Sequence, residues 1–496
     1  MDAQAEFQIL EATIADIHAA YLDGRLTARR LVETYFERIA AYDKAGPAIN
    51  AVISTNPKAL DEADAMDAAL TMGGLVGPLH GIPLIMKDQA DVKDMPTTMG
   101  SVMFRDHYPD RDCFAAAKLK AAGAIFIGKA TLGELGAGDT HGSLFGSTRN
   151  VYDLERTAGG SSGGSGAAVS ANFCAVAIGQ EGFASIRRPA IWNGVAGMRP
   201  TAGLVSRSGV FAGWPTTNGS LGPMARTVED LARVLDCMVG FDPQDPVTAL
   251  GHGKAGQGFC GQLDKNALKG ARIGVLREPM GSHTDTSDPD FHGVTEVFDA
   301  AVADLAAAGA VIVDPVVIPD LKALLATRAR VDADDEAAFD LYVSGSAASP
   351  FTNRREAMAS PLFDQTMRGV KQRWLHKNTP EQHHAYLRAR ELLMTNLHAV
   401  MAEHCLDAIV HKAVEHTPSL IRDGLNPPYV DQRGAPHLNT FLIFVPSVVV
   451  PAGFTRTGLP AGITFLGRPY EDAAMLRVAY AYEQATRKRV PPKVTP

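Results

Sequence analysis

The stretch TAGGSSGGSGAAVSA, from Thr157 to Ala171, holds five glycines and four serines in fifteen residues. Glycine costs backbone entropy and adds no side chain to a core, so such a run needs a reason. It is either a flexible linker, a phosphate-binding turn, or a turn that presents a serine to a substrate. A linker is disfavoured because the run continues into small and apolar residues that favour burial, AAVSANFCAVAIG (167–179).

Two known glycine motifs fit the stretch poorly. No lysine follows the glycines as a P-loop requires, and the preceding YDLERTA (152–158) does not resemble the strand that precedes a dinucleotide-binding turn. Gly160 to Gly164 does match G-x-S-x-G, which would make Ser162 the nucleophile of an α/β-hydrolase-like esterase. That motif also needs a strand before it. The residues before Gly160 do not read as a strand, which counts against this alternative.

Composition narrows the class of protein. The 496 residues are 46% hydrophobic and 21% charged, which is typical of a globular protein, and the formal net charge is −8. An acidic balance argues against binding to nucleic acid and against a basic membrane surface. The five cysteines are scattered, without a C-x-x-C pair, so disulfides and zinc are not expected.

The chain shows no transmembrane or secretory pattern. Its most apolar run, Phe441–Phe454, is short and holds two prolines, which favours a buried strand pair. The first residues, MDAQAEFQIL, begin with an acidic residue and have no apolar signal region. Together with the cysteine usage, this predicts a cytoplasmic protein.

Strand and helix patterns alternate along the chain. Helices are expected after Thr13 and Thr27, and at 114–122, 167–177, 228–238, 293–308 and 472–486. Strands are expected at 82–86, 124–130, 271–276, 311–317, 446–454 and 461–467. Residues 200–227 are expected as turns, 240–270 as a loop, and 320–425 as mostly helical. This alternation predicts an α/β fold with one large sheet rather than independent domains.

Five pieces in order carry a family resemblance. They are GIPLIMKDQ (81–89), FGSTRN (145–150), AGGSSGGSGAAVSA (158–171), SIRRPAIWNGVAGMRPT (185–201) and PAGFTRTGLPAGITFLGRPYED (451–472). The ordered set resembles the amidase signature family of hydrolases. The resemblance implies one α/β/α domain over residues 1–496, with a central twisted mixed sheet covered by helices. It implies no cofactor and no metal, and a homodimer by analogy alone.

The resemblance also assigns a catalytic triad. The family's base lysine falls on Lys87, its bridging serine, held on a cis peptide bond, on Ser161, and its nucleophile on Ser185. A serine hydroxyl is a weak nucleophile that needs an adjacent base, and lysine is a base only when burial keeps it neutral. On this interpretation the glycines let the backbone place the Ser161 hydroxyl between base and nucleophile.

The family's oxyanion hole falls on the backbone N–H groups of Gly182, Phe183, Ala184 and Ser185. Here the chain departs from the family pattern Gly-Thr-Asp-x-Gly-Gly-Ser, because it reads Gly-Gln-Glu-Gly-Phe-Ala-Ser over 179–185. Phe183 would be strained if the family's glycine needs a positive φ, and its ring is also expected to wall the acyl site. Arg187 is expected to pair with Glu181.

The remaining expectations concern the substrate. Leu135 and Ala137 match a substrate-lining segment of the family, or else simply pack. Residues 320–440 are expected to roof the pocket, and their aromatic residues indicate either an aromatic guest or core packing: Phe339, Tyr342, Phe351 and Trp374.

The predicted activity is hydrolysis of a linear C–N bond in a small amide, aryl amide or carbamate (urethane), through an acyl- or carbamoyl-enzyme. Two alternatives stay open: a glutaminase-type subunit of an amidotransferase complex, and a non-catalytic binder. None of the chain's 15 histidines has the spacing of a known metal motif.

Overall fold

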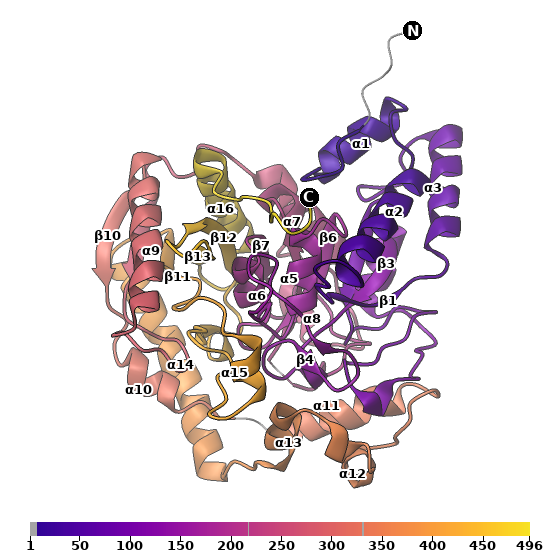
Figure 1. Ribbon diagram of the computed structural model, residues 1–496. Helices are drawn as coiled ribbons and strands as arrows, with labels where there is room; N and C mark the ends of the chain where they lie inside the picture. Colours follow the sequence, from indigo (N-terminus) through magenta and orange to yellow (C-terminus); the bar gives the residue numbers. More distant parts are fainter. Residues whose placement is uncertain (1–6, 217, 330–331) are drawn as a thin grey trace.

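The computed structural model describes residues 7–216, 218–329 and 332–496. An 11-stranded mixed sheet runs through the molecule (Figure 1). Its strands lie side by side in the order β1 (Val52–Thr55), β3 (Ile125–Ala130), β2 (Pro83–Lys87), β6 (Val176–Glu181), β8 (Ser220–Ala225), β7 (Ala196–Arg199), β12 (Ser447–Phe454), β13 (Pro460–Leu466), β11 (Ala408–Lys412), β9 (Arg272–Leu276) and β10 (Val311–Val316). A separate two-stranded ribbon joins β4 (His141–Gly142) to β5 (Gly146–Ser147). The expected α/β class and large central sheet are confirmed.

Helices flank this sheet. They are α1 (Ile14–Leu22), α2 (Ala28–Arg38), α3 (Ala59–Gly73), α4 (Phe114–Ala121), α5 (Gly163–Ser170), α6 (Arg187–Trp192), α7 (Val228–Met238), α8 (Thr248–Gly251), α9 (Pro289–Ala307), α10 (Leu321–Ala326), α11 (Asp332–Ser344), α12 (Arg354–Ala359), α13 (Arg368–Leu375), α14 (Pro380–Glu403), α15 (Ile421–Leu425) and α16 (Asp472–Thr486). Helices α11, α12 and α13 gather at one end of the molecule, below the sheet in Figure 1.

The direction of three central strands positions the functional site. Strands β3, β2 and β6 are parallel neighbours, and every residue of β2 and β6 is buried. A parallel sheet covered on both faces needs such continuous apolar strands. Parallel strands also bring their carboxyl ends to the same edge, which is where open α/β sheets bind ligands. Lys87, which ends β2, therefore lies beside Gln180 and Glu181, which end β6.

The helix starts predicted from the sequence are confirmed where a threonine caps them. The side chain of Thr13 accepts the backbone N–H of Asp16, that of Thr27 accepts the N–H of Arg30, and Thr227 caps α7 in the same way. A threonine oxygen at this position satisfies a helix N–H that has no partner within the helix.

Four element predictions are wrong in part. The helix expected over 167–177 begins at Gly163 and ends at Ser170, and the apolar residues after it form β6. Residues 220–225, expected as turns, are β8, and β11 lies inside the segment expected to be helical. The apolar run Phe441–Phe454, expected as a strand pair, forms one strand, β12. The residues before Ser447 form a turn, where the buried Arg199 donates to the carbonyls of Leu442 and Val445 at 3.4 and 3.0 Å.

The last residues of the chain contact residues near its start, and in Figure 1 the C-terminus lies near α1 and α2. Arg489 pairs with Glu11, and Arg38 donates to the carbonyls of Thr495 and Pro496. The prediction about the N-terminal stretch falls partly on residues 1–6, which lie outside the described residues. Among the helices of the described ranges, none has the length and apolar content needed to cross a membrane.

Candidate active site

Three side chains that are far apart in the sequence form one unbroken line of contacts. Lys87 Nζ donates to Ser161 Oγ at 2.7 Å, and Ser161 Oγ donates to Ser185 Oγ at 3.1 Å. Lys87 ends strand β2, Ser161 precedes helix α5, and Ser185 lies in the loop between β6 and α6. The structure therefore brings together the three residues expected to form a triad, in the expected order.

Lys87 lies in an environment that disfavours its charge. Its side chain is fully buried, and its only other hydrogen-bond partner among the described residues is the carbonyl of Gln180, at 3.1 Å. Burial lowers the pKa of Lys87 well below its usual 10.5; Glu181 opposes this and the Arg373 guanidinium adds to it. A buried amine that is not paired with a carboxylate is uncharged more readily than one in water, so Lys87 is able to accept a proton.

Close packing explains the glycines around Ser161. The Gly160–Ser161 peptide bond is cis, as the family resemblance implies. A Cβ on Gly160 would lie 2.4 Å from the carbonyl oxygen of Gly138, and a Cβ on Gly164 would lie 2.3 Å from Thr131 Oγ1. Any other residue at these two positions would clash, so the run is a tightly packed turn and not a linker.

Hydrogen bonds fix the same turn at each end. Arg188 Nη2 donates to the carbonyl of Gly160 at 2.7 Å and also pairs with Asp139. The N–H of Gly133 donates to the carbonyl of Ser161, and the N–H of Ser162 donates to the carbonyl of Ser185, which ties the two serine loops together. The hydroxyl of Ser161 is therefore held by backbone contacts on both of its neighbours.

Ser162, the nucleophile of the alternative esterase hypothesis, points elsewhere. Its side chain is fully buried at the start of α5, and its Oγ lies 3.3 Å from both the N and the O of Gln180. It is absent from the cavity lining described below. Within the described residues, the Ser162 side chain hydrogen-bonds to the backbone of Gln180 alone, and these are the contacts of a structural serine.

The loop after β6 presents unpaired backbone donors. Within the described residues, the N–H groups of Phe183, Ala184 and Ser185 donate to no acceptor. Neither Phe183 nor Ala184 has a positive φ, so the strain considered for Phe183 is absent. Glu181 accepts the N–H groups of Ile186 and Arg187 and pairs with the Arg187 guanidinium at 2.6 Å. The expected pair of Glu181 and Arg187 is present and buried.

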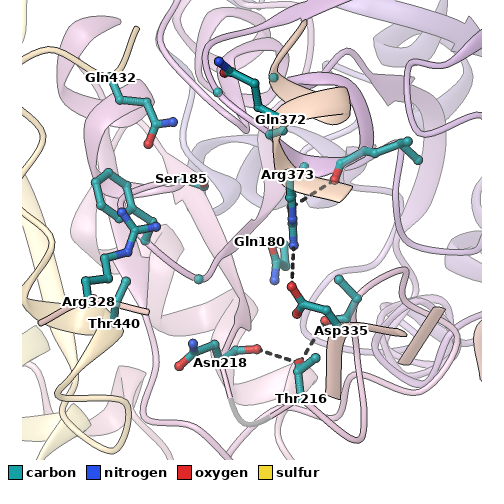
Figure 2. Close-up of a pocket in the computed structure, with 18 of the residues that line it drawn as sticks. Gln180, Ser185, Thr216, Asn218, Arg328, Asp335, Gln372, Arg373, Gln432 and Thr440 are labelled. Carbon is teal, nitrogen blue, oxygen red and sulfur yellow. Dashed lines mark hydrogen bonds and ion pairs between the residues drawn. The ribbon is translucent and has the colours of Figure 1, made fainter. Parts of the chain in front are cut away.

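A cavity of about 360 Å³ opens in front of Ser185 (Figure 2). Leu135, Ala137, Gly182 and Phe183, all named from the sequence, lie in its wall. Leu135 also packs in an apolar cluster with Phe339, Phe351 and Trp374, and these aromatic residues form core around the cavity rather than its lining. Polar and charged side chains dominate the rest of the wall: Gln89, Gln180, Thr216, Asn218, Arg328, Asp334, Asp335, Gln372, Arg373, His376, Tyr386, Asp431, Gln432 and Thr440.

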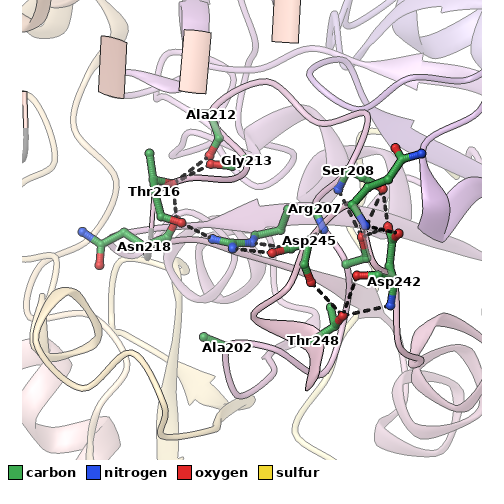
Figure 3. A network of polar contacts seen from close by, with 12 residues as sticks. Ala202, Arg207, Ser208, Ala212, Gly213, Thr216, Asn218, Asp242, Asp245 and Thr248 are labelled. Atoms are coloured by element: carbon green, nitrogen blue, oxygen red, sulfur yellow. Dashed lines mark hydrogen bonds and ion pairs between the residues drawn. The ribbon is translucent and has the colours of Figure 1, made fainter. Parts of the chain in front are cut away.

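One side of this wall is fixed by a buried ion pair (Figure 3). Arg207 binds both carboxylate oxygens of Asp245 at 2.9 Å, and its Nη1 donates to the carbonyl of Thr216 at 2.6 Å. Thr216 Oγ1 in turn donates to the carbonyl of Gly213 at 2.8 Å. Arg207 thus holds the loop that places Ala212, Thr216 and Asn218 at the cavity.

Sequence reasoning does not find the polar half of the cavity. Arg328, Arg373 and Asp431 come from segments without a motif, and their meeting depends on how α10 to α15 fold over the sheet. Gln89 and Gln180 do have a nearby signal, because Gln89 ends the motif GIPLIMKDQ and Gln180 precedes the oxyanion residues. Within the described ranges, no cluster of His, Cys, Asp and Glu could hold a metal ion.

Comparison with known proteins decides the family. A family model described as Amidase matches residues 30–476. This chain belongs to the amidase family. A probable amidase of Arabidopsis thaliana is 30% identical over 98% of this chain and 92% of its own, and a glutamyl-tRNA(Gln) amidotransferase subunit of Heliobacterium modesticaldum is 30% identical over 96% of both.

The solved structures agree with this assignment. The native peptide amidase of Stenotrophomonas maltophilia is 34% identical, covers 98% of this chain and 99% of its own, and superposes with a TM-score of 0.87. The expected amidase signature fold is therefore confirmed. As a member of this family, the chain is an amidohydrolase that cleaves amide C–N bonds.

Proposed function

We propose that this amidase uses Ser185 as nucleophile, Ser161 as proton relay and Lys87 as base. The observation that carries the proposal is the unbroken contact from Lys87 Nζ through Ser161 Oγ to Ser185 Oγ, with the lysine fully buried. A hydroxyl donates one hydrogen bond and accepts others, so the Ser161 hydroxyl can reverse direction when the lysine is neutral.

The reaction then runs in two halves. Ser185 Oγ bonds to the substrate carbonyl carbon, while its proton passes to Ser161 and the proton of Ser161 passes to Lys87. The protonated lysine returns a proton through Ser161 to the leaving nitrogen, the C–N bond breaks, and an acyl-enzyme remains. Water repeats the attack through the same relay and releases the acid and free Ser185.

The oxyanion of each tetrahedral intermediate needs donors beside Ser185. Among the described residues, the N–H groups of Phe183, Ala184 and Ser185 are the nearest set without an acceptor, and Gly182 completes the loop. Losing one such donor typically raises the barrier by about 3–4 kcal/mol. Because a backbone N–H survives any side chain, the replacement of the family's glycines leaves this role intact.

The cavity supports a small substrate with polar groups around the reacting amide or carbamate. Arg328, Arg373, Asp334 and Asp335 offer both signs of charge, while apolar surface near Ser185 comes from Leu135 and Phe183. We infer that residues 320–440, which supply much of this wall, decide which amide or carbamate is taken.

A substrate panel tests this proposal. Purified protein is assayed on short primary amides, peptide amides, anilides and aryl carbamates, alongside S185A and S162A. We expect turnover of polar amides by the wild type and by S162A, and none by S185A. Equal activity in S185A, or loss confined to S162A, would overturn the assignment of the nucleophile.

We propose further that the chain works without an amidotransferase partner. The support is its likeness over nearly full length to a peptide amidase, although the amidotransferase relative is as similar in sequence as the plant amidase. Size-exclusion chromatography of the active protein is expected to show this chain alone, as a monomer or homodimer. Glutaminase activity that appears only with added partner subunits would favour the alternative.

We propose a cytoplasmic location on the basis of thiol chemistry. All five cysteines are free, and Cys405 is exposed. Free exposed thiols persist in a reducing compartment. Fractionation of cells that express the native gene, with detection by antibody, would place the protein; recovery from the periplasm or medium would contradict the proposal.

A further inference from the structure

The ring of Phe183 contacts two side chains from the other half of the chain. The Arg328 guanidinium carbon lies 4.3 Å from the centroid of the ring. The His437 ring stacks on Phe183, with centroids 5.5 Å apart and planes at 12°. Figure 2 shows Arg328 on the same side of the cavity as Ser185. A cation over an aromatic face and an aromatic stack are both attractive contacts with defined geometry.

The backbone of Phe183 is held toward the same segment. Arg187 Nη2 donates to the carbonyl of Phe183 at 2.9 Å and also contacts the carbonyl of Pro436 at 3.4 Å. Ala435 packs with Phe183 and Ala184 in a small apolar cluster. Residues 435–437 therefore contact the loop in three ways: through the Ala435 side chain, through the Pro436 carbonyl that Arg187 also contacts, and through the His437 ring.

His437 suits a stacking role. Burial, with the adjacent Arg328 charge adding to it, lowers the pKa of His437 to about 4. Its ring is uncharged at neutral pH, and a neutral imidazole stacks on Phe183 without adding a second positive charge beside Arg328.

We propose that Arg328 and His437 are positioning residues that hold the ring of Phe183 and thereby orient the backbone donors of residues 183–185. The inference rests on the proposed function, since the oxyanion role of these donors is part of it. The chain has Phe183 and Ala184 where the family pattern has two glycines. The stack uses the added side chain to fix a loop that carries three free N–H groups. It also connects the segment that roofs the cavity to the reacting centre.

The consequence for catalysis is specific. Substrate still binds in the cavity when the ring loses its partners, but the oxyanion donors lose their fixed direction. The loss falls on kcat more than on KM, because the donors act on charge that develops only in the transition state.

Five variants test the stack. F183L and H437L remove one ring each, R328M removes the charge, and H437F and R328K keep the ring or the charge. We expect kcat to fall by at least about tenfold in the first three, since a misplacement of about 1 Å can cost about 100-fold. KM should change less than kcat in H437L, because His437 is not part of the cavity lining, and H437F and R328K should recover most of the loss in kcat. The matched control is F241L, because Phe241 also contacts a histidine ring but is half exposed and outside the cavity.

The double variant F183L/H437L completes the test. If both residues act through one stack, its kcat matches that of F183L alone; independent effects would multiply. A kcat within twofold of wild type in F183L, multiplicative losses, or no recovery in H437F and R328K would overturn the proposal. If F183L does not fold, the comparisons of H437L with H437F and of R328M with R328K test the proposal instead.

S185A separates this inference from the proposed function. If S185A is inactive but F183L keeps full activity, the stack proposal is wrong and the proposed function stands. If S185A is active, the proposed function is wrong, whatever the results for the variants at position 183.

Discussion

Lys87 is the residue on which the chemistry depends. Its amine contacts a hydroxyl and a carbonyl, and the nearest charges that influence it are those of Glu181 and Arg373. Water would hold the proton on such an amine at neutral pH, and burial removes that water. The fold thus produces a base by excluding solvent from the end of β2.

The pH dependence of the reaction should report this amine. Because only neutral Lys87 accepts a proton, kcat/KM should rise with pH through the folded-state pKa and then level off. Burial lowers that pKa well below 10.5, so we expect the plateau to be reached before pH 10.5. A pH–rate profile checks this, and an ascending limb with its midpoint near 10.5 would mean that Lys87 is solvated.

The variant R373M should move the same profile. The Arg373 charge helps to lower the pKa of Lys87, so its removal should shift the midpoint of the ascending limb to higher pH. Arg373 also lines the cavity, and its loss will change the height of the profile; the midpoint is therefore the quantity to compare. A midpoint that stays in place would show that the two charges do not interact.

At the scale of elements, the site depends on loops held by buried ion pairs. Arg207 and Asp245 fix the loop at Thr216, as Arg187 and Glu181 fix the loop at Phe183. In both pairs the arginine uses a spare N–H to bind a carbonyl of the loop that it fixes. Strand β2 supplies Lys87, the loops after and beside β6 supply the two serines, and these ion pairs fix the shape of the cavity around them.

The variant R207M should damage both stability and binding. It leaves the Asp245 carboxylate buried without its partner, which typically costs about 3–5 kcal/mol, and it releases the Thr216 loop. We expect lower stability in urea and a higher KM. R456M is the matched control: Arg456 is 83% exposed and forms a surface pair with Glu296, so its loss should cost about 1 kcal/mol or less. Equal effects of the two variants would contradict this role of Arg207.

Sequence patterns predict the helices whose starts are set by a nearby capping side chain. Thr13, Thr27 and Thr227 cap helices because their oxygens reach N–H groups three residues on, which sequence alone specifies. Strand β8 and the turn before β12 escape prediction because long-range contacts determine them. Strand β8 forms by pairing with β6 and β7, and the turn forms around Arg199. The triad is found through ordered family motifs, whereas the charged cavity wall depends on tertiary packing without local signal.

At the scale of the whole molecule, the cysteines are spread through one continuous structure without pairing. Cys113, Cys174 and Cys237 are buried, Cys260 is partly buried and Cys405 is exposed. Burial raises the pKa of Cys113 and of Cys174 to about 12, which suppresses their reactive thiolate form.

Thiol titration should therefore distinguish folded from unfolded protein. We expect the native protein to react quickly with Ellman's reagent at Cys405, more slowly at Cys260, and at all five positions only in denaturant. C405S should abolish the fast phase without changing amidase activity. Fast labelling of three or more thiols in the native protein would mean that the core opens readily.

Covalent labelling by a fluorophosphonate tests the central claim most directly. The wild-type protein is treated with the reagent, digested, and mapped by mass spectrometry, with S185A and K87M in parallel. The account predicts a single adduct on Ser185, its complete loss in S185A, and much slower labelling in K87M, where no base remains. An adduct on Ser162, or labelling in K87M at the wild-type rate, would contradict it.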